Sequence, residues 1–376
     1  MKDNLTNFDT VIVGGGVIGL SIARSMALRG VRNICVIERQ ECGTEASFAA
    51  AGMLAPQAEA DNPDEFFQLL CRSRDLYPDW ASTLKAETGI DIELDLTGTI
   101  CLSFNEDEEQ ELRQRFEWQS KAGLSAERLT TAEVRRLEPQ ISASVTGALL
   151  FPRDVQVENR RLLAALATSV QVLGVSVMNE TNVEEVVVSA GHVSGVQTNK
   201  GLIQSPTVVI AAGAWSDLTG AMKFPVEPVR GQMVCLSAKP QLTRHVIYSP
   251  RGYLVPRQDG RLIAGSTTER VGYLKMVTAG GVKSILMNAS EISPAIERLP
   301  LVTSWAGLRP RAPDGLPLLG PCDEIEGLIY ATGHYRNGIL LAPLTGELIA
   351  ETVVDGRISG ELATFSPNRF RFANVN

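Results

Sequence analysis

Short apolar runs and stretches of helical periodicity alternate near the start of the chain. Residues 10–13 (TVIV) form a β-branched run that ends at glycine, as a buried parallel strand does. Residues 17–28 carry apolar side chains at helical spacing and stop at Arg29-Gly30, and residues 33–37 form a second apolar run. The start of the chain therefore predicts one βαβ unit. The same alternation of strand and helix patterns returns later. A helix is expected over 159–169, and strands are expected near 174–178, 183–188, 206–212 and 328–331.

The middle of the chain has a different pattern, in which apolar and polar residues alternate. Residues 91–104 alternate on either side of Thr97-Gly98, which predicts an antiparallel hairpin. A last helix, with Pro343 expected in its first turn, follows the strand at 328–331. Further elements are expected as strands at 226–237, 244–256 and 261–265, helices at 63–88 and 282–291, and a short capped helix from Thr130 to Pro139.

These two textures predict a mixed α/β fold, α+β overall, with two domains. We expect a discontinuous Rossmann-like nucleotide-binding domain made of residues 1–88, 150–220 and 306–376. An antiparallel-sheet substrate domain, made of residues 89–149 and 221–305, is then inserted into it. Neither an internal repeat nor a low-complexity linker interrupts this arrangement.

A glycine motif lies directly between the first predicted strand and its helix. Gly14, Gly16 and Gly19 follow the spacing G-x-G-x-x-G, which allows a tight turn and a close approach of backbone N–H groups to a pyrophosphate. Glu38 ends the second strand, where an acid accepts hydrogen bonds from a ribose diol and disfavours a 2′-phosphate. A glycine-rich turn without a ligand is the alternative. The complete order of strand, glycines, helix, strand and acid argues against it.

The motif alone does not separate NAD from FAD, and two further segments favour FAD. One is 208–215, where an apolar run enters Ala211-Ala212-Gly213, and the other is 329–341 (IYATGHYRNGILL), which crosses from strand to helix. A helix N-terminus aimed at the pyrimidine edge of a flavin would stabilise the negative charge of the reduced ring. Residues 43–56 are mostly small, which indicates that a ligand or another part of the protein packs closely on that backbone. The discontinuous domain is therefore expected to bind FAD.

Composition and charge argue against several other classes of protein. The formal net charge of −8 and the pI near 5.2 disfavour nucleic-acid and anionic-membrane partners. The six cysteines are scattered without a C-x-x-C pair, and with three histidines no metal site is expected. Residues 1–9 lack the pattern of a secretory signal, and several glycines interrupt the apolar stretch 11–28. We expect a cytoplasmic protein with reduced cysteines.

Several longer motifs make the sequence recognisable. In chain order they are AAAGMLAPQAE (49–59), PVEPVRGQMV (225–234), GYLVPRQDGRLIAGST (252–267), WAGLRP (305–310) and GHYRNGILLAP (333–343). With these motifs the chain resembles the glycine oxidase branch of the D-amino-acid oxidase family of flavoproteins. The resemblance implies an enzyme that binds FAD non-covalently. In related sarcosine oxidases a cysteine near the ring holds the flavin, whereas 305–315 has no cysteine here and Cys322 lies beyond it.

The activity implied by the resemblance is oxidation of a small amino acid at its amine-bearing carbon. Hydride transfer from that carbon to flavin N5 gives an imine, which hydrolyses to a 2-oxo acid and ammonia or an amine. Dioxygen then reoxidises the flavin and yields hydrogen peroxide. Glycine, sarcosine, D-alanine and other N-alkyl glycines stay open as substrates. The resemblance also suggests a homo-oligomer and a role in thiamine synthesis, with catabolism as the alternative.

A substrate carboxylate needs a fixed cation, and the planar fork of arginine provides one better than lysine does. Arg309 matches the family's carboxylate-binding arginine, and the full catalytic set implied is Arg309, Tyr253, Arg336, Tyr273 and Met53. The cofactor-binding set is Gly14, Gly15, Gly16, Val17, Ile18, Gly19, Glu38, Arg39, Ser47, Ala51, Gly52, Met53, Val183, Ala212, Gly213, Trp215, Arg309, His334, Tyr335, Arg336, Asn337, Gly338, Ile339 and Leu340. These motifs contain no obvious general base.

Other interpretations of these residues stay open. Arg309 could be a buried arginine paired with a protein acid, Tyr253 a plain core aromatic, and His334 either a base or a shaper of its turn. Arg251 and the stretch 274–276 depart from the family pattern, which leaves substrate preference open. Two other functions are a dehydrogenase that uses an acceptor other than dioxygen, and a non-catalytic binding protein on the same scaffold.

Overall fold

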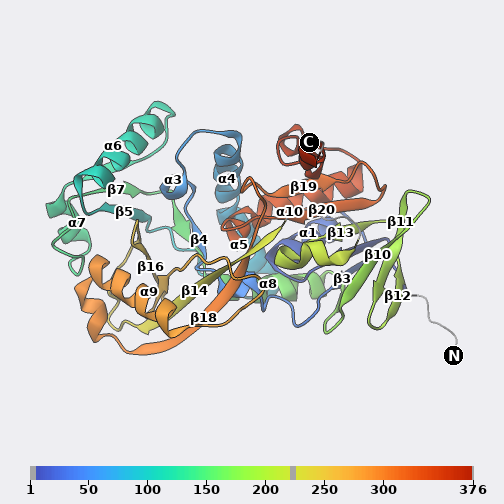
Figure 1. The fold of residues 1–376 in the computed structure, drawn as a ribbon, viewed down its shortest axis with the longest axis horizontal. Helices are drawn as coiled ribbons and strands as arrows, with labels where there is room; N and C mark the ends of the chain where they lie inside the picture. Colours follow the sequence, from blue (N-terminus) through green and yellow to red (C-terminus); the bar gives the residue numbers. More distant parts are fainter. Residues whose placement is uncertain (1–5, 221–225, 375–376) are drawn as a thin grey trace.

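The computed structural model of the chain describes residues 6–220 and 226–374. Two large sheets organise these residues, one in each half of the molecule (Figure 1). Within the described ranges, no helix combines the length and the apolarity that crossing a bilayer requires.

A six-stranded sheet forms the core of the first half. In spatial order its strands are β19 (Leu318–Pro321), β20 (Leu328–Thr332), β13 (Val208–Ile210), β2 (Thr10–Val13), β3 (Ile34–Ile37) and β9 (Ser176–Met178). All neighbours run parallel except β19, which is antiparallel to β20. The central strands are fully buried because both faces are covered, which is why they are uniformly apolar. Beside this sheet, α1 (Val17–Leu28) packs against both α8 (Asn159–Val172) and α10 (Gly338–Asp355).

An eight-stranded sheet organises the second half. In spatial order its strands are β18 (Leu301–Arg311), β14 (Glu227–Ser237), β17 (Arg261–Gly265), β16 (Gly252–Pro256), β15 (Val246–Ser249), β5 (Thr99–Ser103), β7 (Gly147–Phe151) and β6 (Glu127–Leu129). One face packs on α9 (Ala279–Ile292), through residues such as Leu254. Tyr253 and Val255 lie on the opposite face, where they contact Ala51 and Met53. Strand alternation in β16 thus separates a structural face from one that meets the first half.

Smaller elements complete the described part of the chain. A four-stranded sheet contains β1 (Thr6–Asn7), β12 (Gly201–Gln204), β11 (His192–Thr198) and β10 (Val183–Ser189), and β4 (Met53–Leu54) pairs with β8 (Val155–Gln156). The other α-helices are α2 (Ala46–Ala49), α3 (Pro56–Glu59), α4 (Glu65–Asp75), α5 (Tyr77–Thr88), α6 (Glu106–Lys121) and α7 (Thr131–Leu137). The 3₁₀ helices are η1 (Gly213–Thr219), η2 (Pro294–Arg298), η3 (Gly360–Leu362) and η4 (Pro367–Asn374).

The predicted mixed α/β fold is confirmed, and the predicted capping box at Thr130 is present. The prediction of a hairpin over 91–104 is wrong, because β5 begins only at Thr99 and pairs with β7 and β15. Asp91 and Asp95 instead accept hydrogen bonds from the backbone N–H groups two residues later, which folds this stretch into turns. The predicted helix over 63–88 is two helices that meet near Leu76. The division into domains stays a prediction, and β18 runs across its boundary at 305/306.

Pro343 lies in the second turn of α10, not in the first as predicted, because the helix begins at Gly338. A proline at this position cannot donate to the carbonyl four residues earlier, which belongs to Ile339. The hydroxyl of the fully buried Tyr77 donates to that carbonyl instead. The side chain of α5 thus completes the hydrogen bonding of α10 close to its N-terminus.

We predict that Tyr77→Phe lowers the free energy of unfolding by about 1–3 kcal/mol, because it leaves a buried carbonyl without a donor. Urea unfolding of the purified variant measures this loss. Ser73→Ala is the matched control: Ser73 donates to Leu340 O at 2.7 Å, a carbonyl that also has a helical donor, so a smaller loss is expected. Equal losses in the two variants would contradict this explanation.

Candidate active site

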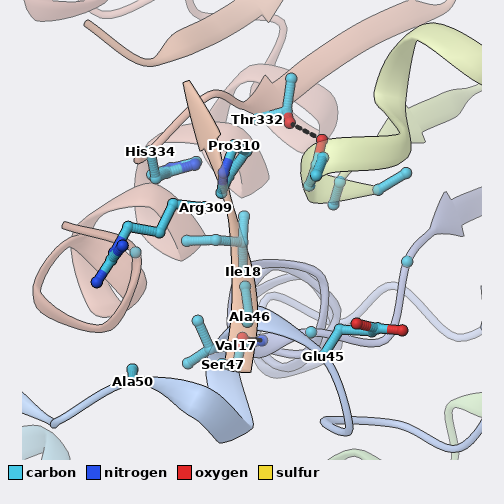
Figure 2. A pocket seen from close by; sticks show the side chains of 18 of the residues that line it. Val17, Ile18, Glu45, Ala46, Ser47, Ala50, Arg309, Pro310, Thr332 and His334 are labelled. Carbon is cyan, nitrogen blue, oxygen red and sulfur yellow. Dashed lines mark hydrogen bonds between the residues drawn. The ribbon is translucent and has the colours of Figure 1, made fainter. Parts of the chain in front are cut away.

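A cavity of about 460 Å³ lies where the two halves meet, at the carboxyl ends of β2, β13 and β20. Ligands of open α/β sheets bind at this edge, outside the ends of the parallel strands. Figure 2 shows part of its lining, with Val17 and Ile18 from α1, Arg309 and Pro310 from β18, and Glu45, Ala46, Ser47 and Ala50. The hydroxyl of Thr332, at the end of β20, reaches η1 by donating to Gly213 O at 3.1 Å.

The glycine motif forms the turn between β2 and α1. Gly14 has φ +112°, and a Cβ there would lie 2.4 Å from Ala211 O. A Cβ on Gly19 would lie 1.9 Å from Gly14 O. The backbone of α1 therefore packs directly against the backbone of the glycine turn, with no room for a side chain. The N-cap residue Gly16 offers no side chain to the first turn of α1. This end of the helix therefore presents N–H groups and positive partial charge to the cavity.

Glu38 stands at the end of β3 and lines the same cavity. Its carboxylate accepts hydrogen bonds from the N–H of Gly15 at 2.8 Å and from that of Gln40 at 3.0 Å. A carboxylate has about four lone-pair sites, so acceptor capacity is left for ligand hydroxyls. The two backbone bonds hold Glu38 in place beside the glycine turn.

A second helix N-terminus opens into the cavity. Asn337, the N-cap residue of α10, makes no side-chain cap, and residues 334–339 all line the cavity. Tyr335 has φ +48° and donates its N–H to Pro310 O at 2.8 Å, which joins this turn to β18. The cavity therefore meets two sources of positive partial charge, at the N-termini of α1 and α10. Such a site suits an elongated ligand with a pyrophosphate and a second electron-rich group.

The family model described as FAD dependent oxidoreductase matches residues 9–352. The chain belongs to this family. A glycine oxidase of Geobacillus kaustophilus is 39% identical over 96% of this chain and 97% of its own length. A bifunctional protein ThiO/ThiG of Trichormus variabilis is 38% identical over 96% of this chain, which spans 55% of that protein. The crystal structure of the Geobacillus kaustophilus glycine oxidase has a TM-score of 0.93 at 37% identity, covering 97% of this chain and 99% of that one.

FAD is therefore the cofactor of this FAD-dependent oxidoreductase, and the resemblance found in the sequence is confirmed. The described residues fit the group, because one cavity is lined by Glu38 and by two helix N-termini whose N-cap residues make no side-chain cap. Of the predicted site residues, all line the cavity except Gly15, Gly19, Leu340 and Tyr273. Gly15 packs on Cys42, Gly19 on Gly14, and Leu340 is buried in the core.

Arg309 lines the cavity from β18 without an acidic partner. Its guanidinium donates to Thr267 O at 3.2 Å and to Ser266 Oγ at 2.8 Å. Among the residues that the structure describes, no carboxylate lies within 4.0 Å of it. A Cβ on Gly231 would lie 2.1 Å from Arg309 Nη1, so this glycine makes room for the guanidinium. The positive charge therefore stays available to an anionic ligand, and pairing with a protein acid is not observed.

Tyr253 reaches the cavity from β16, and its hydroxyl donates to Met233 Sδ at 3.2 Å. Thioether sulfur is a weak acceptor, so a carboxylate could draw this donor away from the sulfur. Tyr253 and Arg309 are both buried or half-buried and come from strands of the same sheet. They offer two donors to one anion.

Arg336 carries a partner that sequence reasoning missed. Its guanidinium lies 3.7 Å from the carboxylate of Glu59, and both residues line the cavity. The negative charge of Glu59 is the main cause that raises the pKa of Arg336 above its usual value. Glu59 is the last residue of the AAAGMLAPQAE motif. Its place in that motif was the only sequence feature that could have indicated a role for Glu59 in the site. The pair leaves Arg309 as the cation with spare charge at this end of the cavity.

The residues around 273–275 lie at the rim of the cavity and do not line it. The Tyr273 ring packs on Trp215 at 6.1 Å between centroids, and its hydroxyl donates to Ala214 O at 3.1 Å. Lys275 pairs with Glu45 at 2.7 Å. Tyr273 therefore packs on Trp215 and Ala214, two residues that line the cavity. Arg251, which departs from the family pattern, is bound to Glu108 and Glu291 outside the lining.

His334 is buried and lines the cavity, and its Nε2 lies 3.2 Å from Thr345 Oγ1. Burial lowers the pKa of His334 to about 3, because the charged form is desolvated. An imidazole that stays neutral at pH 7 with so low a pKa is a poor proton acceptor. The position therefore favours the role of shaping the turn over that of a base.

This low pKa predicts a loss of stability in acid. The unfolded state binds a proton with a pKa near 6.5, so unfolding takes up a proton between about pH 6.5 and 3. Stability is present above that window and falls as the pH drops through it, by at most about 1.4 kcal/mol per pH unit. His334→Gln should flatten the pH dependence of the urea midpoint of the FAD-loaded protein between pH 6.5 and 4.5. Equal slopes in the variant and the parent would contradict the assignment.

Proposed function

We propose that the enzyme oxidises glycine, or an amino acid about as small, with dioxygen as the electron acceptor. The observation that carries this proposal is the unpaired guanidinium of Arg309 inside the cofactor cavity. The relatives named glycine oxidase support the choice of substrate class. The overall reaction converts glycine, dioxygen and water into glyoxylate, ammonia and hydrogen peroxide.

The chain's own residues bind and orient the substrate. Arg309 donates from its planar guanidinium to the α-carboxylate, and Tyr253 donates its hydroxyl to the same group. Met53 and Tyr253 stand beside the substrate and limit its side chain to a small one. FAD supplies the hydride acceptor when it is bound. Because His334 is neutral and Glu59 is paired with Arg336, the ammonium proton leaves to water before the α-carbon is oxidised.

Sarcosine, D-alanine and other N-alkyl glycines are the neighbouring substrates to compare. The test is to purify the protein, record its visible spectrum, and add each amine without air. Bleaching of the flavin by glycine, followed by stoichiometric peroxide when air is admitted, is the expected result. A flavin that bleaches without yielding peroxide in air identifies a dehydrogenase with another acceptor. A flavin that no small amine reduces contradicts the proposal and favours a binding protein.

Non-covalent attachment of FAD forms part of the proposal. No cysteine is found among the described lining residues, and Cys322 is buried away from the cavity. Acid precipitation should therefore release all the yellow colour into the supernatant. The proposed cytoplasmic location, homo-oligomer and role in thiamine synthesis stay predictions from the sequence.

A further inference from the structure

The segment 47–52, which lines the cavity, is held by an unusual set of donors. Asn159 Nδ2 donates to Ser47 O at 2.8 Å and to Phe48 O at 3.1 Å. Trp305 Nε1 donates to Ala49 O at 3.0 Å. The N–H of Val157 donates to the carbonyl of residue 52 at 2.9 Å. None of these donors lines the cavity, so they hold the segment from outside the cavity.

Arg257 provides the remaining anchor, and its side chain is only 4% exposed. Its Nη2 donates to Ala51 O at 2.7 Å and to Asn159 Oδ1 at 3.3 Å. Its Nη1 donates to Val157 O at 3.0 Å and to Gln156 Oε1 at 2.8 Å. The guanidinium thus joins Ala51 to Asn159 and Val157, the residues that donate to Ser47, Phe48 and Gly52. Burial of a guanidinium is expensive, and lysine could not reach these acceptors in one plane.

The place of Arg257 in the fold links segment 47–52 to the strand that carries Tyr253. Arg257 directly follows β16, the strand that carries Tyr253. Four residues of extended strand span about 13 Å, so β16 sets a fixed distance between the substrate-facing tyrosine and the anchor of the flavin-facing backbone. A shift of about 1 Å between reacting groups can lower a rate by about 100-fold.

We propose that Arg257 is a positioning residue. It holds segment 47–52 at a fixed place relative to Tyr253 and Arg309, the proposed substrate-binding residues on the eight-stranded sheet. The proposal rests on the proposed site of amino-acid oxidation. It assigns to Arg257 an effect on kcat, on FAD affinity and on the electronic environment of the flavin. It assigns no effect on substrate binding, which depends on Arg309.

The experiment compares FAD-loaded Arg257→Met with the parent enzyme. We expect kcat to fall about 10- to 100-fold with KM for glycine changed less than about threefold. The loss of a charged hydrogen bond to Ala51 O should raise the dissociation constant of FAD about tenfold or more. The visible absorption and circular dichroism bands of the bound flavin should also shift, which a loss of global stability alone would not produce.

Arg261→Met is the matched control. Arg261 pairs with Glu158 at 2.6 Å, the same acid that lies 3.4 Å from Arg257 Nε, but it contacts no residue of segment 47–52. Its flavin spectrum, FAD affinity and kcat should equal those of the parent. Asn159→Ala, which removes the donors to Ser47 and Phe48, should shift the spectrum as Arg257→Met does.

Two results would overturn the proposal. One is an Arg257→Met enzyme with the parent's spectrum, FAD affinity and kcat, and the other is an Arg261→Met enzyme that reproduces the changes. If Arg257→Met does not fold, Arg257→Lys decides, with a smaller change in the same direction expected and an unchanged enzyme contradicting the role. FAD affinity and the spectrum are measured without substrate, so failure of glycine as substrate leaves this test decisive.

Discussion

Arg309→Ala is expected to raise the KM for glycine about 150- to 5,000-fold while FAD stays bound. The guanidinium has no protein acid to neutralise it, so its bond to the substrate carboxylate is worth about 3–5 kcal/mol once water is excluded. Arg309→Lys keeps the charge but loses the fork, and we expect it to recover only part of this loss. Initial rates over a range of glycine concentrations, together with the flavin-to-protein ratio, measure the effect.

Arg270→Ala is a suitable control for Arg309→Ala. Arg270 belongs to the same half of the protein, its side chain is 67% exposed, and it pairs with Glu227 at 3.5 Å. Exposed pairs of this kind contribute little, so kinetics within about twofold of the parent are expected. An Arg309→Ala enzyme with a nearly normal KM would reject Arg309 as the carboxylate anchor.

Gly19→Ala is expected to produce a protein without bound FAD. The added Cβ would lie 1.9 Å from Gly14 O, and a backbone oxygen inside the loop cannot yield unless α1 moves away from β2. That movement would take the helix N-terminus away from the place where we expect the pyrophosphate of FAD to bind. It should also lower the free energy of unfolding by about 1–3 kcal/mol. The ratio of absorbance near 450 nm to protein absorbance and urea unfolding measure the two effects.

Gly280→Ala is the control for Gly19→Ala. It tests whether a glycine-to-alanine change elsewhere in the protein also causes loss of FAD. Gly280 lies in the first turn of α9, and a Cβ there meets nothing within 4 Å. This variant should bind FAD as the parent does and gain up to about 1 kcal/mol of stability. Retention of stoichiometric FAD by Gly19→Ala would contradict the assigned role of the glycine turn.

The sequence predicted most of the nucleotide-binding half because its signals are local. The apolar run at 10–13, the glycines and Glu38 are close in the chain, and their order alone indicates the βαβ unit. The hairpin at 91–104 failed because Asp91 and Asp95 form hydrogen-bonded turns that alternation does not reveal. Local turn chemistry overrode the strand pattern there.

Most residues that line the cavity could be named from the sequence, but their geometry could not. The motifs indicated Arg309 and Tyr253, but the room for the guanidinium comes from Gly231 on the neighbouring strand. The pair of Glu59 with Arg336 and the anchor from Arg257 to Ala51 join positions hundreds of residues apart. Tyr273, implied by resemblance, does not line the cavity, and its ring packs on Trp215. Long-range packing of this kind has no periodic signal in the sequence.

The order of strands in the six-stranded sheet bears on how the protein is made. β2 lies between β3, which follows it closely, and β13, which in turn needs β20 from residues 328–332 as its other neighbour. At about 5–20 residues per second, ribosomes leave roughly 15–60 s between the synthesis of β3 and that of β20. Until β20 and α10 have been made, the glycine turn lacks part of the lining that completes the cavity. We therefore expect FAD to bind only after most of the chain has been synthesised.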